Sequence, residues 1–295
     1  MTQQVLIIGA GEIGKALSAV LSRKENLKIK FWDDRARLSS GRDLDSLVKD
    51  SQFIFICVPS SAISEVVSKI KPALRWNTLV ISLTKGVEKT SGKFSNEILR
   101  RRFGRRRTAI LAGPMIAEEL KTGAPTKVTV GGTKASFQKL SGLLAGTSLY
   151  VEYSPDSQGV AVAGVLKNIY AMGLGMIDAL EFGSNAKGVF INVALLEMEL
   201  LIKRLGGKSE TVYMLAGLGD LEATGNSPYS TNRIIGRRIV EGKLGKSTGE
   251  GLVSLEPLIR RLENKNLPSA LLTVRRTIKN PKNARKFFEE LIKNA

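Results

Sequence analysis

The stretch VLIIGAGEIG, residues 5 to 14, carries the strongest fold signal in the chain. It joins a short apolar run to Gly9, Gly11 and Gly14 in the spacing G-x-G-x-x-G, and residues 13–25 then continue with helical spacing. Glycines at these positions allow a tight turn, close approach of the backbone to a pyrophosphate, and close packing of helix on strand. The stretch therefore predicts a strand, turn and helix that bind a dinucleotide. The alternative is a turn of the same fold that has lost its ligand.

Strands and helices alternate through the first half of the chain. Helical patterns follow at 62–74 and 136–146. Short runs typical of strands occupy residues 5–10, 28–34, 53–58, 78–83, 108–113, 126–132 and 149–156. This alternation predicts an α/β fold with a Rossmann-type, doubly wound parallel sheet.

Strand patterns end at Pro155, and long helical patterns follow. They cover residues 157–180, 188–206, 209–217, 231–242, 251–265 and 270–295. We therefore expect a dinucleotide-binding domain in residues 1–153 and an all-helical domain in residues 154–295 that carries the substrate and catalytic groups.

The segment 157–177 is nearly long enough to cross a bilayer. Lys167, Asn168 and several glycines interrupt its apolar character, so we expect a buried core helix and no membrane span. An apolar helical domain of this kind also suggests a homodimer.

Composition limits the chemistry. The 295 residues include no histidine and one cysteine, Cys57. A general acid or base must therefore be Lys, Asp, Glu, Tyr, Cys or water, and neither a histidine-ligated nor a thiolate-cluster metal site is expected. A single cysteine suits a reducing cytosol, and the N-terminus lacks the basic region of a signal peptide, so a cytoplasmic protein is expected.

The formal net charge of +18 favours anionic partners. Six arginines lie between Arg100 and Arg107. They indicate either a patch for nucleic acid or a membrane surface, or a solvated helix end and loop beside a strand, and we favour the second interpretation. No aromatic residues suited to base stacking alternate with the arginines, so nucleic acid is not an expected partner.

Two acids end the second predicted strand. Asp33 and Asp34 stand where a carboxylate typically binds the ribose 2′-hydroxyl, and a carboxylate there repels the 2′-phosphate of NADP. NAD is therefore favoured. Arg35 and Arg37 follow directly and leave NADP open as an alternative.

Two lysines are candidates for acid–base chemistry, because burial and a cationic neighbour lower the pKa of an ammonium. Lys85, in SLTKG, follows a predicted parallel strand at the edge where such sheets bind ligands. Lys167 is the only charge between Ser157 and Ile177. The alternatives are a solvent-exposed loop lysine for Lys85 and a core lysine paired with a structural acid for Lys167.

The segment AGLGDLEATGNSPYSTNR, residues 216–233, has the composition of a loop between two helices. Asp220 in this segment is either a helix-capping residue or the partner of a buried lysine.

Several motifs occur together and in one order. They are GAGEIG, CVPSSAI, SLTKG, AGPMIAEEL, GVLKN, AGLGDLEAT, NSPYSTNR and GEG. In this order they resemble the NAD(P)-dependent glycerol-3-phosphate dehydrogenases of the bacterial type, over nearly the whole chain. The resemblance implies interconversion of dihydroxyacetone phosphate and sn-glycerol 3-phosphate for glycerophospholipid synthesis.

The resemblance also implies roles for individual residues. Lys167 looks like the acid–base group, with Lys85, Asp220 and Asn168 completing the catalytic set. Residues implied to contact the small phosphorylated substrate are Lys85, Gly113, Lys167, Asp220, Ser230, Thr231 and Asn232. Residues implied to bind the NAD or NADP cofactor are Gly9, Gly11, Glu12, Ile13, Gly14, Asp33, Asp34, Lys85, Ala117 and Glu250.

Three positions depart from the family pattern. Thr231 replaces an arginine that helps hold phosphate, Met115 replaces a small hydroxyl residue, and Ile13 replaces an aromatic residue in the glycine turn. Two further interpretations therefore stay open. One is a diverged relative within the hydroxyacid dehydrogenase superfamily, acting on another small anionic alcohol; the other is a non-catalytic cofactor-binding or nucleic-acid-associated protein.

Overall fold

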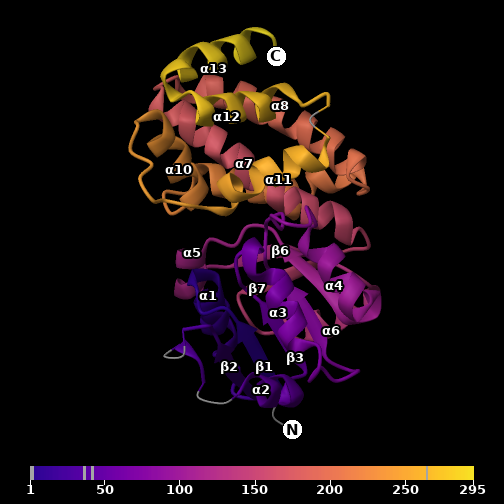
Figure 1. Ribbon diagram of the computed structural model, residues 1–295. Coiled ribbons are helices and arrows are strands. Elements are labelled where there is room, and N and C mark those ends of the chain that lie inside the picture. Colours follow the sequence, from indigo (N-terminus) through magenta and orange to yellow (C-terminus); the bar gives the residue numbers. More distant parts are fainter. Residues whose placement is uncertain (1–2, 36–37, 41–42, 264) are drawn as a thin grey trace.

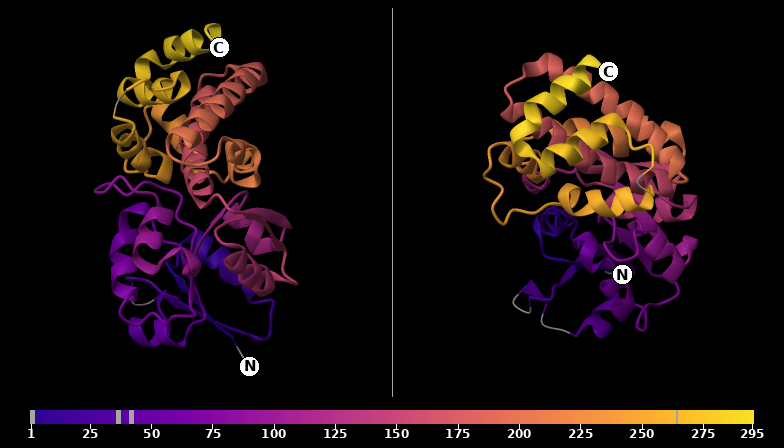
Figure 2. Two further views of the ribbon diagram at one scale, coloured as in Figure 1. Left: turned by 90° about the vertical axis from the view of Figure 1, so that its right-hand side faces the viewer. Right: turned by 45° about the horizontal axis from the view of Figure 1, so that its top comes forward.

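The computed structural model describes residues 3–35, 38–40, 43–263 and 265–295. The chain forms two stacked parts, one built around a sheet and the other from helices alone, with the two termini at opposite ends (Figures 1 and 2). Arg37, which the sequence suggested for NADP binding, lies outside the described residues.

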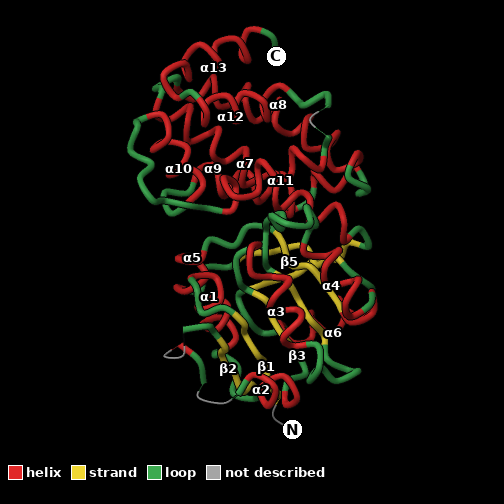
Figure 3. The backbone as a smooth tube through the Cα atoms, viewed as in Figure 1, coloured by secondary structure: helices red, strands yellow, loops and turns green. Residues whose placement is uncertain are grey.

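The sheet has seven strands in the order β2-β1-β3-β4-β5-β6-β7. All neighbouring pairs are parallel except β5 and β6. Figure 3 shows the strands confined to one part of the molecule. They are β1 (Gln3–Ile8), β2 (Leu27–Trp32), β3 (Phe53–Ile56), β4 (Leu79–Ser82), β5 (Thr108–Ala112), β6 (Thr126–Gly131) and β7 (Leu149–Ser154). The predicted doubly wound parallel sheet is confirmed, with one antiparallel pair.

The antiparallel pair follows from the short connection between β5 and β6. A parallel crossover usually needs a helix long enough to carry the chain back across the sheet. Residues 113–125 contain only the six-residue helix α5 (Ala117–Thr122), which packs on α1 (Glu12–Leu21). The chain therefore re-enters the sheet from the edge at which it left.

Helices cover both faces of the sheet and enclose a separate apolar core on each. On one face Leu17, Leu120 and Leu140 belong to one core, and on the other Leu47, Val66 and Leu99 belong to the second. The remaining helices here are α2 (Leu44–Asp50), α3 (Ile63–Ile70), α4 (Ser95–Phe103) and α6 (Lys134–Leu144).

The helical part is assembled around α7 (Ser157–Ala179), in which every residue from Gly159 to Ile177 is buried. Among the described residues, α7 is the one helix long and apolar enough to cross a membrane, and the whole of that apolar stretch lies inside the fold. The predicted buried core helix is confirmed. The other helices are α8 (Gly183–Arg204), α9 (Asp220–Asn226), α10 (Thr231–Val240), α11 (Glu250–Arg261), α12 (Ser269–Lys279) and α13 (Ala284–Lys293).

Three predicted segments differ from the structure. The expected helix at 209–217 is a 3-10 helix, Ser209–Tyr213, followed by a π-helical turn, Leu215–Gly219. A side chain at Gly217 would collide with the carbonyl of Val212, which shows how tightly this turn is wound. The expected loop at 216–233 contains α9, and the pattern at 270–295 is two helices, because Pro281 lacks the N–H that a continuous helix requires.

One core extends across both parts. Phe94, Ile110 and Ala112 from the sheet part belong to the same apolar cluster as α7, which packs against β5 and β6. The secondary structure changes between Ser154 and Ser157. A division into domains at residues 153 and 154 stays a prediction.

Candidate active site

A cavity of about 510 Å³ lies where the carboxyl edge of the sheet meets the helical part. Its walls come from the glycine turn, from the loops after β3 and β4, from α5, and from α7, α9, α10 and α11. Of the residues singled out in the sequence, those lining it are Gly11, Glu12, Ile13, Lys85, Met115, Ala117, Lys167, Asn168, Ser230, Thr231, Asn232 and Glu250.

The glycine turn opens onto this cavity. Gly9 has a positive φ of 101°, and a side chain at Gly14 would lie 2.1 Å from the Gly9 carbonyl oxygen, so both positions require glycine. Nothing lies within 4 Å of where a Gly11 side chain would be. The backbone at the start of α1 is therefore open to a ligand, as a pyrophosphate site requires.

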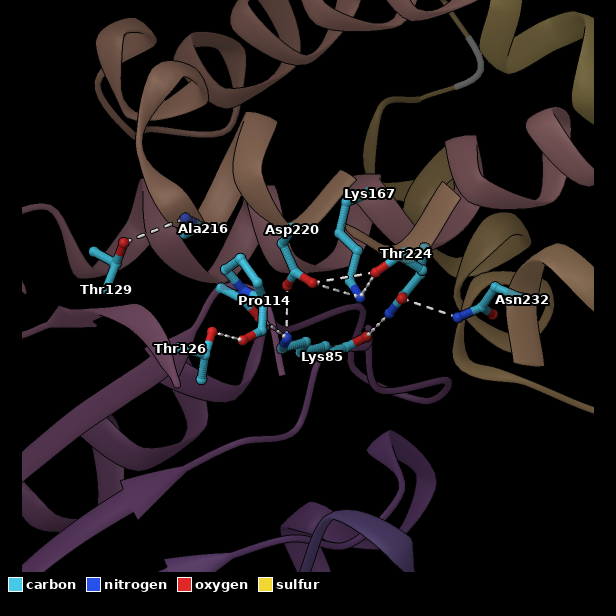
Figure 4. A network of polar contacts seen from close by, with 11 residues as sticks. Lys85, Pro114, Thr126, Thr129, Lys167, Ala216, Asp220, Thr224 and Asn232 are labelled. Carbon is cyan, nitrogen blue, oxygen red and sulfur yellow. Dashed lines mark hydrogen bonds and ion pairs between the residues drawn. The ribbon is translucent and has the colours of Figure 1, made fainter. Parts of the chain in front are cut away.

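Lys167 and Lys85 share the carboxylate of Asp220 (Figure 4). The Lys167 ammonium lies 3.0 Å from Oδ1 and the Lys85 ammonium 2.6 Å from Oδ2. Lys167 also donates to Thr224 Oγ1 at 2.7 Å, and Lys85 to the Gly113 carbonyl at 2.9 Å. Asp220 is 1% exposed and Lys167 6% exposed, so these charges interact with little solvent between them. The prediction that Asp220 is the partner of a buried lysine is confirmed.

The pKa of Lys167 is lowered to about 8, mainly by burial; Asp220 acts to raise it and the nearby Lys85 acts to lower it. For Asp220, burial acts to raise the pKa, but the two lysines outweigh it and the pKa is lowered. Near neutral pH the site therefore holds a fixed carboxylate beside a lysine that can exchange a proton.

Asparagine side chains join the loop that carries Lys85 to three helices of the helical part. Asn168 donates to the Lys85 carbonyl at 3.0 Å, and Asn232 donates to Asn168 Oδ1 at 2.9 Å. Asn232 Oδ1 in turn accepts from the Gly251 amide at 3.0 Å. These bonds fix the positions of α7, α10 and α11 around the cavity.

The N-terminus of α10 faces the cavity. Ser230 caps this helix, its hydroxyl accepting from the Arg233 amide, and Thr231 is exposed. The Arg233 guanidinium does not line the cavity; its Nε lies 2.6 Å from Asp178 Oδ2. Arg233 therefore does not replace the arginine that Thr231 lacks, and Met115 lines the cavity as a buried apolar side chain.

Glu250 is the first residue of α11 and reaches the sheet part. Its Oε1 accepts from the Ser60 amide at 2.9 Å, and Oε2 is buried with no hydrogen-bond partner among the described residues. Burial raises the pKa of Glu250. A buried carboxylate oxygen without a partner is the kind of group that a ligand hydroxyl would satisfy.

Asp33 lies at the end of β2, away from the lysines. Its carboxylate accepts from the Ala10 amide at 2.8 Å and pairs with Arg35 at 2.7 Å, contacts that hold its pKa well below the usual range, with the Arg35 bond the largest cause. Asp34 is exposed and lies 3.7 Å from Lys69.

Six predicted site residues lie outside the cavity lining. Gly9 and Gly14 shape the glycine turn, and Asp33 and Asp34 follow β2. Asp220 and Gly113 bind Lys85 from the side away from the cavity. The Gly113 carbonyl binds Lys85, and its contact with a substrate stays a prediction.

Thr224 and Ser60 were not predicted as site residues. Thr224 accepts from Lys167 and donates to Asp220 Oδ1 at 3.2 Å. It stands four residues after Asp220, the spacing that places two side chains on one helix face, but the segment read as a loop. Ser60 carries no comparable signal, because its role depends on Glu250, 190 residues away.

Comparisons with known proteins agree with this geometry. Two sequence profiles match, one described as the N-terminus of NAD-dependent glycerol-3-phosphate dehydrogenase over residues 35–138 and one as its C-terminus over residues 156–289. Glycerol-3-phosphate dehydrogenase [NAD(P)+] of Idiomarina loihiensis is 34% identical over 268 residues, which is 82% of this chain and 80% of that protein.

A solved structure is also similar over its full length. Glycerol-3-phosphate dehydrogenase from Coxiella burnetii superposes with a TM-score of 0.88 over 99% of both chains, at 28% identity. The profiles, the relative and this superposition lead to one conclusion: the chain belongs to the family of NAD(P)-dependent glycerol-3-phosphate dehydrogenases.

Proposed function

We propose that this protein interconverts dihydroxyacetone phosphate and sn-glycerol 3-phosphate with a nicotinamide cofactor, with Lys167 as the acid–base group. The observation that carries the proposal is the pair of lysines sharing Asp220 in a cavity that opens onto the glycine turn. The printed names of the relatives support the substrate pair. We further propose that the reaction takes place in the cytoplasm and supplies glycerophospholipid synthesis.

The residues present fit a dinucleotide. The open backbone at Gly11 suits the pyrophosphate, and the unpartnered Glu250 oxygen suits a hydroxyl or amide of the cofactor. The Glu12 carboxylate beside the turn is paired with Lys121 and Lys15, which limits its repulsion of phosphate. When bound, the cofactor supplies or accepts the hydride. We propose NAD as the preferred form, because Asp33 repels a 2′-phosphate even while Arg35 shields it.

Lys167 manages the proton of the substrate C2 oxygen. Its ammonium has three N–H groups, and Thr224 and Asp220 accept two of them among the described residues. The third is available to the substrate in the cavity that Lys167 lines. In the reduction direction Lys167 gives this proton to the C2 oxygen as the hydride reaches C2, and in oxidation the neutral amine takes it back.

Other residues hold the substrate in position. Lys85 and Asn168 stand beside Lys167 and fix the carbonyl end. The amides at the start of α10 and the hydroxyls of Ser230 and Thr231 suit the phosphate, because a helix N-terminus attracts anions. Preorganised positive charge of this kind stabilises an anionic transition state.

The proposal includes a division of roles between the two parts of the chain and a homodimer. Residues 1–153 bind the cofactor, and residues 154–295 carry Lys167 and the phosphate contacts. A homodimer would cover the exposed Leu196 and Leu200 on α8. Sedimentation equilibrium measures its mass directly, and loss of the dimer in Leu200→Glu would locate the interface on α8.

The proposed function is tested by following NADH and NADPH oxidation with dihydroxyacetone phosphate. Turnover is expected with NADH, and Lys167→Met is expected to lower kcat about a thousandfold while cofactor affinity is retained, since general acid catalysis is lost. A wild-type protein that binds NADH but turns over no dihydroxyacetone phosphate would refute the proposal. Turnover with a different small ketone would instead support the diverged relative that Thr231 and Met115 suggest.

A further inference from the structure

The arginine cluster of the sequence lies at the edge of the sheet opposite the cavity. Arg100, Arg101 and Arg102 end α4, and Arg105–Arg107 form a 3-10 turn directly before β5. The cluster is thus a helix end and a turn beside a strand, with all six side chains at least partly exposed. Cations in the last turn of a helix complement its dipole, which accounts for the first three arginines but not for Arg105 and Arg106.

An open groove of about 800 Å³ adjoins this turn. We call it the basic groove; the side chains that define it are Trp76, Arg105, Arg106, Arg107 and Lys139. Trp76 is 84% exposed, more than any other large apolar side chain described. Arg107 links the segment before β4 to the end of α4: it donates to the Arg75 carbonyl at 3.3 Å and to the Phe103 carbonyl at 3.0 Å. The indole and the free arginines therefore share one fixed surface.

The charges of the basic groove are unneutralised. Within the part of the chain that the structure describes, no carboxylate pairs with Arg105, Arg106 or Lys139, nor with Arg100–Arg102 beside them. An exposed indole is the kind of side chain that lies at the headgroup level of a bilayer. The unpaired cations around it attract anionic lipids.

The groove and the cavity lie at opposite ends of the same strands. Trp76 precedes β4 and Lys85 follows it, while Arg107 precedes β5 and Gly113 follows it. The five residues of β5 separate the two ends by roughly 13 Å at the usual rise of a strand. A surface bound at the groove would therefore leave the cavity open to substrate and cofactor.

We propose that the basic groove docks the protein reversibly on an anionic lipid surface, through Trp76, Arg105 and Arg106. The choice of lipid follows from the exposed indole among unpaired cations, and it rests in part on the proposed function in glycerophospholipid synthesis. Nucleic acid suits the groove less well: continuous single-strand binding uses several stacked aromatics, and Trp76 is the one exposed aromatic ring that lines this groove among the described residues.

The experiment measures binding of the full-length protein to vesicles of phosphatidylglycerol with phosphatidylcholine, and of phosphatidylcholine alone, by co-sedimentation. We expect binding to the anionic vesicles only, weakened by added salt. Arg105→Gln with Arg106→Gln is expected to lower affinity about 30-fold. Lys282→Gln with Lys286→Gln removes the same charge from exposed positions near and in α13, and is expected to have little effect.

A second readout follows the indole itself. The chain has two tryptophans, so Trp32→Phe leaves Trp76 as the only one, and its emission should shift to the blue on anionic vesicles. Equal loss in the two charge-matched variants, no blue shift, or tighter arginine-dependent binding to poly(U) or a DNA duplex than to vesicles would each overturn the proposal. Reduction of dihydroxyacetone phosphate in solution should be unchanged in Arg105→Gln with Arg106→Gln, which separates this test from that of the proposed function.

Discussion

Burial disfavours the charged form of Lys167, and the carboxylate of Asp220 stabilises it. Asp220 divides its two oxygens between Lys167 and Lys85, so neither lysine has the carboxylate to itself. Removing either partner of a buried charge pair leaves an uncompensated charge, which is why such groups are found mainly where chemistry needs them. Substitutions of these three residues therefore test the reaction most directly.

The pH dependence follows from the pKa of Lys167, which is about 8. Reduction needs the protonated form, so kcat/KM for dihydroxyacetone phosphate should fall as pH rises above about 8. Oxidation of glycerol 3-phosphate needs the neutral amine, so kcat/KM in that direction should fall as pH drops below about 8. Initial rates in both directions measure the two pH profiles. If kcat/KM changed with pH in the same direction for both reactions, Lys167 would be excluded from proton transfer.

Thr231→Arg should restore a cation at the N-terminus of α10. A charge-assisted bond to phosphate is expected to lower KM for dihydroxyacetone phosphate about tenfold, with a smaller change in kcat. Thr90→Arg adds the same charge at an exposed position outside the cavity lining and serves as the control. An unchanged KM in Thr231→Arg would mean that the phosphate is held elsewhere.

Sequence alone predicted the lysine centre because its signals are local. A charge in an apolar helix and a lysine after a strand each stand in one short segment, and the absence of histidine is read directly from the composition. The partners of these groups could not be predicted in the same way. Glu250 binds Ser60, which lies 190 positions away in the sequence. Thr224 belongs to a helix whose glycines and polar residues are typical of a loop.

At the scale of elements, α7 and α10 approach so closely that glycine is required on both. A side chain at Gly175 would lie 1.9 Å from the Arg233 carbonyl oxygen, and one at Gly236 would lie 1.9 Å from the Met172 carbonyl oxygen. Their close contact places Asn232 within reach of Asn168. The helix pair therefore sets the geometry between the lysine and the proposed phosphate site.

Gly175→Ala should separate these helices. The methyl group collides with backbone, which cannot rotate away, so we expect a loss of about 3 kcal/mol in the free energy of unfolding. Gly142→Ala in α6 meets nothing within 4 Å and should instead gain about 0.5–1 kcal/mol from helix propensity. Urea denaturation measures both, and equal stability of the two variants would contradict the role of Gly175.

Strand and helix periodicity identified the long elements but not the irregular ones. The helix at 157–179 is a long, almost uniformly apolar segment, the helix at 231–240 has a clear helical periodicity, and both were predicted to within a few residues. The antiparallel β6 was not predicted, because its apolar alternation is that of any strand and its direction depends on the short α5 connection.

At the scale of the whole molecule, Arg261 joins the two parts. Its guanidinium on α11 makes two bonds of 2.7 Å to Glu97 on α4, a third to the Gly92 carbonyl, and lies 4.7 Å from the centre of the Phe94 ring. Arg275 makes a similar bidentate pair with Glu256, but inside the helical part. The Arg261 pair therefore connects the two parts of the molecule, whereas the Arg275 pair connects two helices of one part.

Arg261→Lys should affect activity as well as stability. Losing the planar two-bond contact is expected to lower the unfolding free energy by about 1 kcal/mol and, by loosening the two parts around the cavity, to lower kcat/KM about tenfold. Arg275→Lys should bring a similar stability loss with unchanged kcat/KM. Thermal unfolding and steady-state kinetics of both variants measure this difference; equal kcat/KM values would remove Arg261 from this role.

The burial of α7 also has a consequence for how the chain is made. Its apolar surface is covered by α8, α9, α10, α11 and α12, all of which follow it in the sequence, as well as by β5 and β6. While the chain leaves the ribosome, α7 therefore emerges before most of its cover, as a bare apolar helix long enough to enter a bilayer. A chain that stops before α10 would lack Asn232 and the helix N-terminus proposed to bind phosphate, and it would expose α7 to aggregation or to capture by a chaperone.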